Sequence, residues 1–318
     1  MKKTERSQTY YNKLICKIFI LGNASQGESI IFLMYGDDKL IYSCITDSFV
    51  IEDKLAVEDI FKSLNIEKIE DLFWTHPHND HSDGIVKIID KYKPSHIFIP
   101  AELQSLPQSV PGLSRNTLEA INKCKTLDRR CSNLPQICTV CTNKLILNEN
   151  LTVGSYDIPF YIFGVAPFDS IVRKKALKCS YRTLNDFSIA LSITVGDFNI
   201  LLTGDVQDEV LEYVDAEDIF GIHRPNVLKI PHHGSLHSFK IRNLFQEELD
   251  DSNIDISITT SKSPSKLPNE QALNYYNSFS ENLYSINSNS SGIATWGVDV
   301  DILGRTITNI CSNNYLKN

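Results

Sequence analysis

Apolar runs separated by glycine-containing turns make up the first part of the chain. KIFILG, ESIIFLMYG and KLIYSCITDSF predict three successive strands. VEDIFKSLNIEKI then has apolar residues at helical spacing, and DLFWT predicts a short buried strand. A helix at GIVKIIDKY and a strand at SHIFIP follow. Because strands and helices alternate in this way, we expect an α/β fold.

The pattern loosens between Pro107 and about Asn143, where SRNTLEAINKCKTLDRR predicts a surface helix and CSNLPQICTVC predicts a loop. Strands resume at KLIL, YIFGV, SIALSITV and NILLTG, and VLKI predicts another between helices at DVQDEVLEYV and HSFKIRNLFQEEL. ISITT, LYSI and GIATW predict the last strands, with a helix near Gln271 to Tyr276. We therefore expect one α/β domain with two sheets over residues 1–318, with a cysteine-containing insert at about 107–143.

Composition narrows the class of protein. The 318 residues are 42% hydrophobic and 22% charged, which is typical of a globular protein with a sizeable core. A net charge of −8 argues against non-specific coating of nucleic acid but leaves room for a locally basic cleft. No run reaches the length of a membrane span, and Lys17 interrupts the apolar stretch at the N-terminus. With 8 scattered cysteines expected to be reduced, we predict a cytoplasmic protein with no membrane partner.

Three histidines and an aspartate are concentrated in WTHPHNDHSDG, directly after the strand predicted at DLFWT. His76 and His78 are two residues apart and can bind one ion, whereas Asp80 and His81 can bind a second. One ion would need fewer ligands than this cluster offers. We therefore expect two divalent metal ions, zinc first, with manganese or iron as alternatives.

Two later strand ends carry further ligand-type side chains. LLTGDV places Asp205 after a glycine, where its carboxylate could bridge two cations. KIPHHGS places His232 and His233 past another strand end. This spacing does not decide which of the two histidines binds metal; we expect His232 to be the ligand and His233 to face substrate.

These residues resemble a known family. THPHNDH is similar to the HxHxDH signature of the metallo-β-lactamase fold, and Asp205 and His232 match its later motifs. The resemblance covers approximately Leu14 to Trp296 and implies a four-layered αββα sandwich with metals at one edge. CITDSF resembles the Asp-bearing second motif of the family, which implies that Asp47 orders the loop beneath the metals through hydrogen bonds.

The ComEC-like subgroup of competence proteins is the closer match. NDFSIAL, LLTGD and LKIPHHGS are similar to its successive motifs, which implies roles near the site for Asn185 and Ser188. Fuller members of the wider family have another histidine ligand between the first cluster and the bridging aspartate. His96 is the only histidine in that interval here, and we expect it to belong to the strand at SHIFIP.

Two such ions imply hydrolysis by a metal-bound hydroxide, with Asp80 exchanging the proton and with His233 and Asn185 beside the substrate. A phosphodiesterase or nuclease acting on nucleic acid or a nucleotide is favoured. The basic segment before Asn185 supports an anionic substrate; its charged residues are Arg173, Lys174, Lys175, Lys178 and Arg182. The alternatives are a solvated surface helix for this segment, a hydrolase of lactone, thioester or lactam bonds, and a non-catalytic binding module.

The insert offers a separate metal hypothesis. Cys138 and Cys141 have the spacing of a zinc knuckle, and Cys124 and Cys131 lie upstream. Four thiolates could hold a structural zinc ion. The alternative is that Cys124 belongs to the buried face of a helix.

Overall fold

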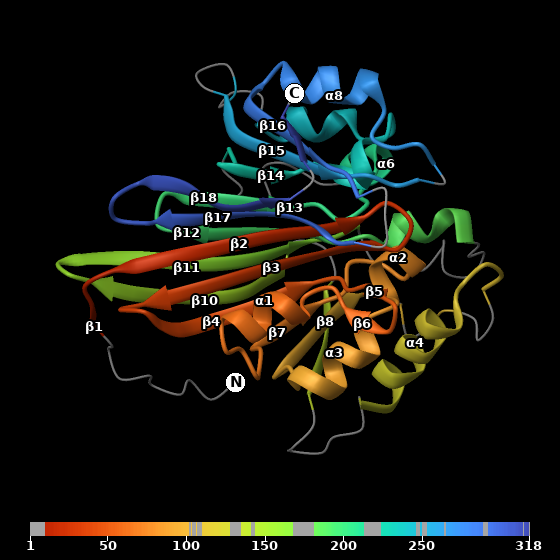
Figure 1. Cartoon of the computed structure of the whole chain (residues 1–318), viewed down its shortest axis with the longest axis horizontal. Helices are drawn as coiled ribbons and strands as arrows, with labels where there is room; N and C mark the ends of the chain where they lie inside the picture. Colours follow the sequence, from red (N-terminus) through yellow and green to blue (C-terminus); the bar gives the residue numbers. More distant parts are fainter. Residues whose placement is uncertain are drawn as a thin grey trace.

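Two large β-sheets pack face to face, and helices cover both outer faces (Figure 1). The computed structural model describes residues 10–101, 103, 106, 110–127, 135–140, 144–167, 181–212, 224–245, 249, 253–263, 265–288, 292–313 and 315–317. The layering within these ranges confirms the expected four-layered αββα sandwich.

The first sheet has eight strands within the described ranges, in the order β18-β17-β2-β3-β4-β7-β8-β9. Their bounds are β2 Leu14–Asn23, β3 Gly27–Gly36, β4 Lys39–Thr46, β7 Asp71–Phe73, β8 His96–Pro100, β9 Gln136–Val140, β17 Ala294–Asp301 and β18 Thr306–Asn313. Strands β4, β7, β8 and β9 are mutually parallel, so their carboxyl ends lie along one edge.

The second sheet has nine strands in the described part of the chain, in the order β1-β10-β11-β12-β13-β14-β15-β16-β19. Their bounds are β1 Tyr10–Tyr11, β10 Lys144–Val153, β11 Tyr156–Val165, β12 Ala190–Val195, β13 Phe198–Leu202, β14 Val227–Lys229, β15 Ile254–Thr260, β16 Ser280–Ile286 and β19 Tyr315–Lys317. Strands β13 to β16 are parallel and also end along one edge. A small hairpin is formed by β5 Val50–Ile51 and β6 Lys54–Leu55.

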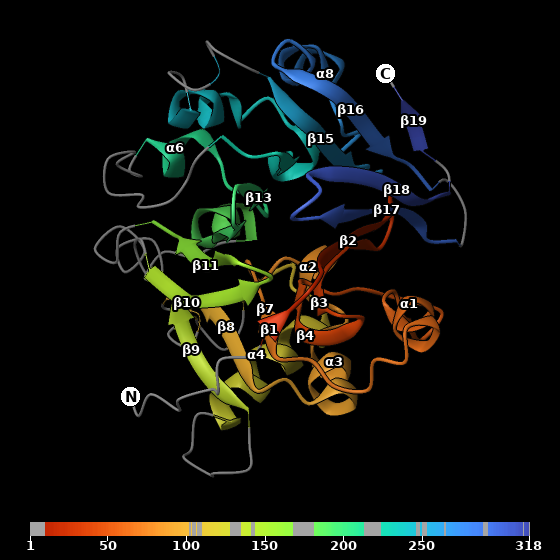
Figure 2. The ribbon, with the colours of Figure 1, turned by 90° about the vertical axis from the view of Figure 1, so that its left-hand side faces the viewer.

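The helices divide between the two outer faces, as Figure 2 shows from the side. α1 Glu58–Ser63, α3 Ile85–Tyr92 and α4 Arg115–Leu127 cover the first sheet. α6 Asp208–Leu211 and α8 Glu270–Asn277 cover the second. Short elements at the strand ends are α2 Asn79–Ser82 and the 3-10 helices η2 Tyr181–Phe187, η3 Pro231–Gly234 and η4 Phe239–Phe245. None of the described helices is long and apolar enough to cross a membrane.

Strand β2 shows how one strand serves two cores. Ile18 and Ile20 point between the sheets, whereas Phe19 and Leu21 point toward the covering helices. Successive side chains of a strand face opposite sides, so a strand in the middle layers buries both sets. This explains why the predicted strands are continuous apolar runs, and it gives a rigid platform for the loops at the strand ends.

One expectation for secondary structure was wrong. The segment expected to be a loop between Cys131 and Cys141 contains β9, which pairs in parallel with β8. The helix expected at HSFKIRNLFQEEL is the 3-10 helix η4 over its described central part. β9 lies at the sheet edge, where only one side of the strand is paired and the apolar signal is weaker.

The two described cysteines of the insert belong to different cores. Cys124 on α4 packs with the core beneath the helices, whereas Cys138 on β9 contacts the core between the sheets. The two thiols therefore face opposite sides of the first sheet, which does not suit a shared zinc ion. Burial raises the pKa of the Cys124 thiol to about 12, as in an inert core cysteine. Cys131 and Cys141 lie outside the described residues.

His96 belongs to β8, as expected, and its Nδ1 lies 2.8 Å from Asp71 Oδ1. The hydrogen bond to Asp71 raises the pKa of His96 above its ordinary 6.5. Because the folded-state pKa is raised, the charged pair stabilises the fold fully below about pH 6.5, and this stabilisation is lost as pH rises through the folded-state value.

We predict that His96→Gln lowers the free energy of unfolding more at about pH 5.5 than at about pH 8. Urea unfolding of both proteins across this range measures the difference, and Asp71→Asn, which removes the partner, should flatten it. A difference that is constant or grows with pH would contradict this origin of the stability.

Candidate metal centre

The ligand-type side chains lie where strands of both sheets end at one edge of the sandwich. α2, which carries Asp80 and His81, follows β7 and lies at the right-hand end of the sheets in Figure 1. Asp205 follows β13, and His232 and His233 follow β14. Parallel strands bring residues that are distant in sequence to a common edge, where α/β proteins build their sites.

The first ligand cluster consists of His76, His78 and Asp205. Nε2 of His76 and Nδ1 of His78 lie 2.9 Å apart, and His76 Nε2 lies 3.6 Å from Asp205 Oδ2. Burial, reinforced by the charge of His81, holds the pKa of His76 well below its ordinary range. A neutral imidazole is the form that binds a metal ion.

Asp47 determines which nitrogen of two histidines carries the hydrogen. Its carboxylate accepts hydrogen bonds from Thr75 N at 2.7 Å and Thr75 Oγ1 at 2.6 Å, and from His81 Nδ1 at 2.7 Å. Since Thr75 gives its only hydroxyl hydrogen to Asp47, its Oγ1 must accept from His76 Nδ1, 3.0 Å away. Both His76 and His81 are therefore protonated on Nδ1, which leaves Nε2 to face the centre. Such carboxylate–histidine contacts orient metal ligands.

The second cluster consists of Asp80, His81, Asp205 and His233. Nε2 of His233 lies 3.2 Å from Asp80 Oδ2 and 3.6 Å from Asp205 Oδ1. On its other side, His233 Nδ1 is hydrogen-bonded to Thr260 Oγ1, which donates to Glu28 Oε2. Thr260 thus repeats the arrangement of Thr75, and Nε2 of His233 is left to face the cluster.

Asp205 lies between the two clusters. Its Oδ1 is 3.3 Å from His81 Nε2, and its Oδ2 faces His76. Both oxygens are buried and, like His81 Nε2, have no hydrogen-bond partner among the described residues. A buried carboxylate without hydrogen bonds costs several kcal/mol unless a cation lies beside it. Two divalent ions, one on each side of this carboxylate, fit the atoms that remain unpartnered.

The electrostatics of the centre favour cations. Among the described residues, two ammonium groups, those of Lys229 and Lys262, face four carboxylates. The carboxylates belong to Glu28, Asp47, Asp80 and Asp205. Burial alone would raise the pKa of Asp205, but His81, His233 and His232 hold it well below its usual range. Burial alone would lower the pKa of His81, but the carboxylates of Asp205, Asp80 and Asp47 raise it well above its usual value. The carboxylates that stabilise this proton would equally stabilise a metal cation.

The backbone around the ligands adopts left-handed conformations. Asp47, His232 and His233 have φ values of 57°, 47° and 53°. Non-glycine residues rarely adopt positive φ, and such residues concentrate at functional sites. Gly204 has φ 51°, and a Cβ there would lie 2.7 Å from Ser188 Oγ. That hydroxyl accepts the hydrogen bond of Asp205 N at 3.0 Å, so Ser188 supports the turn that presents Asp205.

The sequence analysis expected His232 to be a metal ligand and His233 to face substrate, and the structure places the two histidines as follows. His232 Nε2 lies 3.9 Å from Asp205 Oδ2, on the side of His76, and 3.1 Å from Asn185 Nδ2. The second cluster contains His233 instead. Burial lowers the pKa of His232 to about 4, so the imidazole is neutral at pH 7. Asn185 Oδ1 is buried and has no hydrogen-bond partner in the described part of the chain.

Three functional neighbours were missed by the sequence analysis. Glu28 and Lys229 form a fully buried ion pair, with 2.9 Å between Oε2 and Nζ, and Lys262 Nζ lies 2.7 Å from Asp80 Oδ2. A charged residue inside an otherwise apolar strand was the available signal for the first two.

Of the basic segment, Arg173, Lys174, Lys175 and Lys178 lie outside the described residues, as does the side chain of Arg182.

No family model and no curated protein matches the chain. Among solved structures, it is similar to CmlA from Streptomyces venezuelae, a diiron β-hydroxylase, with 14% identity over 67% of this chain and 34% of CmlA and a TM-score of 0.35. The E377D mutant of CmlA β-hydroxylase matches with 14% identity, 68% and 35% coverage and a TM-score of 0.38. The chain spans about a third of these CmlA chains.

A third similar structure comes from Parabacteroides distasonis and is classed provisionally as a metal-dependent hydrolase. Its identity to this chain is 11%, and the TM-score is 0.33. The match covers 75% of this chain and 84% of the other chain.

Gly27 yields a prediction about the second cluster. Its φ is 145°, and a Cβ there would lie 2.0 Å from the backbone oxygen of Asp80. We expect Gly27→Ala to displace Asp80 and to weaken zinc binding by about 10- to 100-fold, measured by calorimetric titration. Gly154→Ala is the matched control, because Gly154 also has positive φ but nothing within 4 Å of the added carbon. Equal zinc affinity in both variants would show that Gly27 does not position Asp80.

The Glu28–Lys229 pair yields a prediction about stability. Burial would raise the pKa of Glu28, but Lys229, His233 and His81 hold it below its ordinary value. Glu28→Gln should therefore lower the free energy of unfolding by about 3–5 kcal/mol, because it leaves the Lys229 ammonium buried and unpaired. The double variant with Lys229→Met removes both charges of the pair and should be more stable than Glu28→Gln alone. Urea unfolding measures both; additive losses would refute the coupling.

Proposed function

We propose that the protein is a metal-dependent hydrolase and that its substrate is a phosphodiester. The observation that carries the proposal is the buried Asp205 carboxylate, whose two oxygens lack hydrogen bonds among the described residues and face separate clusters of ligand atoms. Within each cluster the ligand atoms lie within 4.8 Å of one another, as shared coordination requires.

In this proposal two divalent ions, zinc expected, would lie on either side of Asp205. His76 and His78 would hold the first, and Asp80, His81 and His233 would hold the second, with Asp205 contributing to both. When bound, such a pair lowers the pKa of water and polarises the oxygen of an ester, amide or phosphodiester. The Nε2 atoms of His76, His81 and His233 suit this role. Thr75, Asp47 and Thr260 hold the Nδ1 hydrogens of these rings on the outer side, so Nε2 faces the clusters.

The remaining residues around the clusters would act on substrate. His232 is neutral at pH 7 and lies beside Asn185 on the first-ion side, so both are placed to exchange hydrogen bonds with a bound ester. Asp80 Oδ2 contacts both His233 and Lys262. This oxygen is therefore the proposed site through which a proton passes during turnover.

A phosphodiester is favoured over an uncharged ester by the cation at the centre. Lys262 is 19% exposed and contacts a residue of the second cluster, so it can attract a negatively charged substrate. The basic segment that precedes Asn185 in the sequence supports the same choice. A lactone, thioester or lactam would gain nothing from these charges.

We predict that Asp205→Ala reduces hydrolysis of bis-p-nitrophenyl phosphate below detection and lowers the bound zinc, while circular dichroism shows an intact fold. Asp197→Ala is the matched control, because Asp197 is exposed and pairs with Arg305 away from the clusters. Chelation should abolish the activity of the unmodified protein, and zinc or manganese should restore it. Full activity in Asp205→Ala would remove the basis of the proposal.

The substrate class is tested by comparing single-stranded DNA, duplex DNA, RNA and bis-p-nitrophenyl phosphate with a panel of lactones, thioesters and lactams. We expect turnover of phosphodiesters alone. Robust turnover of an uncharged ester with no cleavage of any phosphodiester would reject the phosphodiester assignment and keep the hydrolase.

A further inference from the structure

A cavity of about 430 Å³ lies at the carboxyl ends of β15 and β16, next to the strand end that carries His232 and His233. It is lined by Ala24, Ser261, Lys262, Ser263, Lys266, Leu267, Pro268, Leu273, Ser285 and Asn287. The metal ligands are not among these residues, so the cavity is a neighbour of the centre and not part of it.

The cavity and the metal centre share a wall. Ser263 N donates to Ala24 O at 2.7 Å, which fastens the loop after β15 to the turn between β2 and β3. The same turn contains Gly27, which lies against Asp80. Lys262 completes the connection, since it lines the cavity and its Nζ contacts Asp80 Oδ2. A molecule bound in the cavity would therefore lie beside the second ligand cluster.

The lining of the cavity is basic and polar. Lys262 and Lys266 contribute positive charge, and no carboxylate is among its described lining residues. Three serines line it as well.

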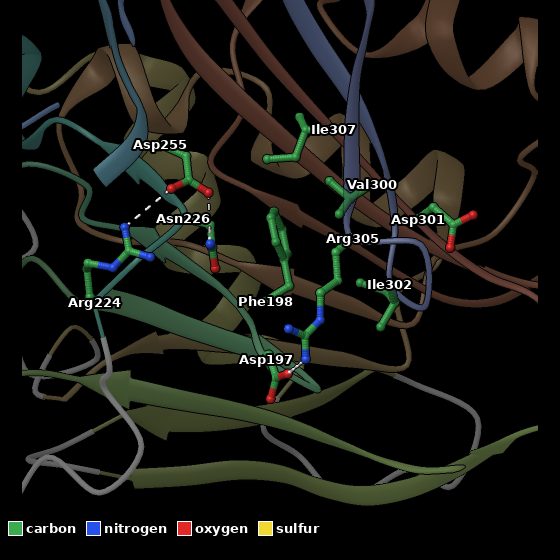
Figure 3. A pocket seen from close by; sticks show the side chains of 10 residues that line it. All are labelled: Asp197, Phe198, Arg224, Asn226, Asp255, Val300, Asp301, Ile302, Arg305 and Ile307. Carbon is green, nitrogen blue, oxygen red and sulfur yellow. Dashed lines mark hydrogen bonds and ion pairs between the residues drawn. The ribbon is translucent and has the colours of Figure 1, made fainter. Parts of the chain in front are cut away.

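A second cavity lies at the opposite edge of the sandwich (Figure 3). Its two arginines point toward carboxylates, Arg224 toward Asp255 and Arg305 toward Asp197. With three aspartates in its lining, that cavity is not suited to an anion.

We propose that the cavity beside the metal centre binds the phosphate adjacent to the scissile phosphate of a nucleic-acid strand. This inference rests on the proposed phosphodiesterase function and names its substrate as a polynucleotide. Lys262 and Lys266 contact the phosphate, and Leu273 and Pro268 give the sugar an apolar surface. A strand suits the arrangement because consecutive phosphates can occupy two neighbouring sites, whereas a simple diester fills only the metal centre.

Lys266→Glu tests the proposal, because Lys266 is exposed and lies outside the metal clusters. Lys39→Glu, at an exposed position on β4, is the matched control for the change of charge. The first readout is the anisotropy of a short fluorescein-labelled single-stranded DNA, with and without chelator. We expect several-fold weaker binding for Lys266→Glu, and a slope of log affinity against log salt that is smaller by about 0.7. Lys266→Arg should bind as the unmodified protein does.

The second readout is turnover. Lys266→Glu should raise KM for the single-stranded DNA several-fold and leave bis-p-nitrophenyl phosphate hydrolysis unchanged, since that diester has no second phosphate. Binding and KM equal to those of Lys39→Glu would overturn the proposal, as would the absence of DNA binding to the unmodified protein. If no phosphodiester is cleaved, the proposed function fails by itself, and the anisotropy measurement still decides whether the cavity binds a strand.

Discussion

The Asp205 carboxylate sets the conditions for the whole centre, because it is buried and neither oxygen has a hydrogen-bond partner among the described residues. Burying such a charge is costly unless cations lie beside it. Gly204 and Ser188 hold it at the end of β13, where the ends of β7 and β14 bring imidazoles to both of its sides. The buried carboxylate therefore favours positive charge at this edge, which the protonated His81 supplies in part and metal ions would supply more fully.

A second layer of buried groups gives the imidazoles their direction. Asp47 acts on His81 directly and on His76 through Thr75, and Glu28 acts on His233 through Thr260. In each case the outer ring nitrogen is held by a hydrogen bond, to Asp47 directly or to a threonine that itself donates to a carboxylate, and the inner nitrogen faces the clusters. The strained backbone at Asp47 and His233 is the conformation that these contacts require.

That these ligand-type side chains lie together could be predicted from sequence, because each follows an apolar strand within a short motif, as His76 and Asp205 do. The supporting layer could not. Glu28 and Lys229 lie in different sheets, and their pairing depends on how β3 and β14 approach one another. The positions of His232 and His233 relative to Asp205 depend on two consecutive left-handed residues, which no spacing rule encodes. Edge strands such as β9 and β18 were missed because pairing on one side leaves a weak apolar pattern.

The cavity at the ends of β15 and β16 lies at the same edge as the metal centre. Lys262 connects them, since it lines the cavity and contacts Asp80. All of this depends on Asp205 lying between two cations. Anomalous diffraction from zinc-soaked crystals measures that directly. We predict two zinc peaks, one near His76 and His78 and the other near His81 and His233, with the Asp205 carboxylate between them. A single peak away from Asp205, or none at saturating zinc, would contradict it.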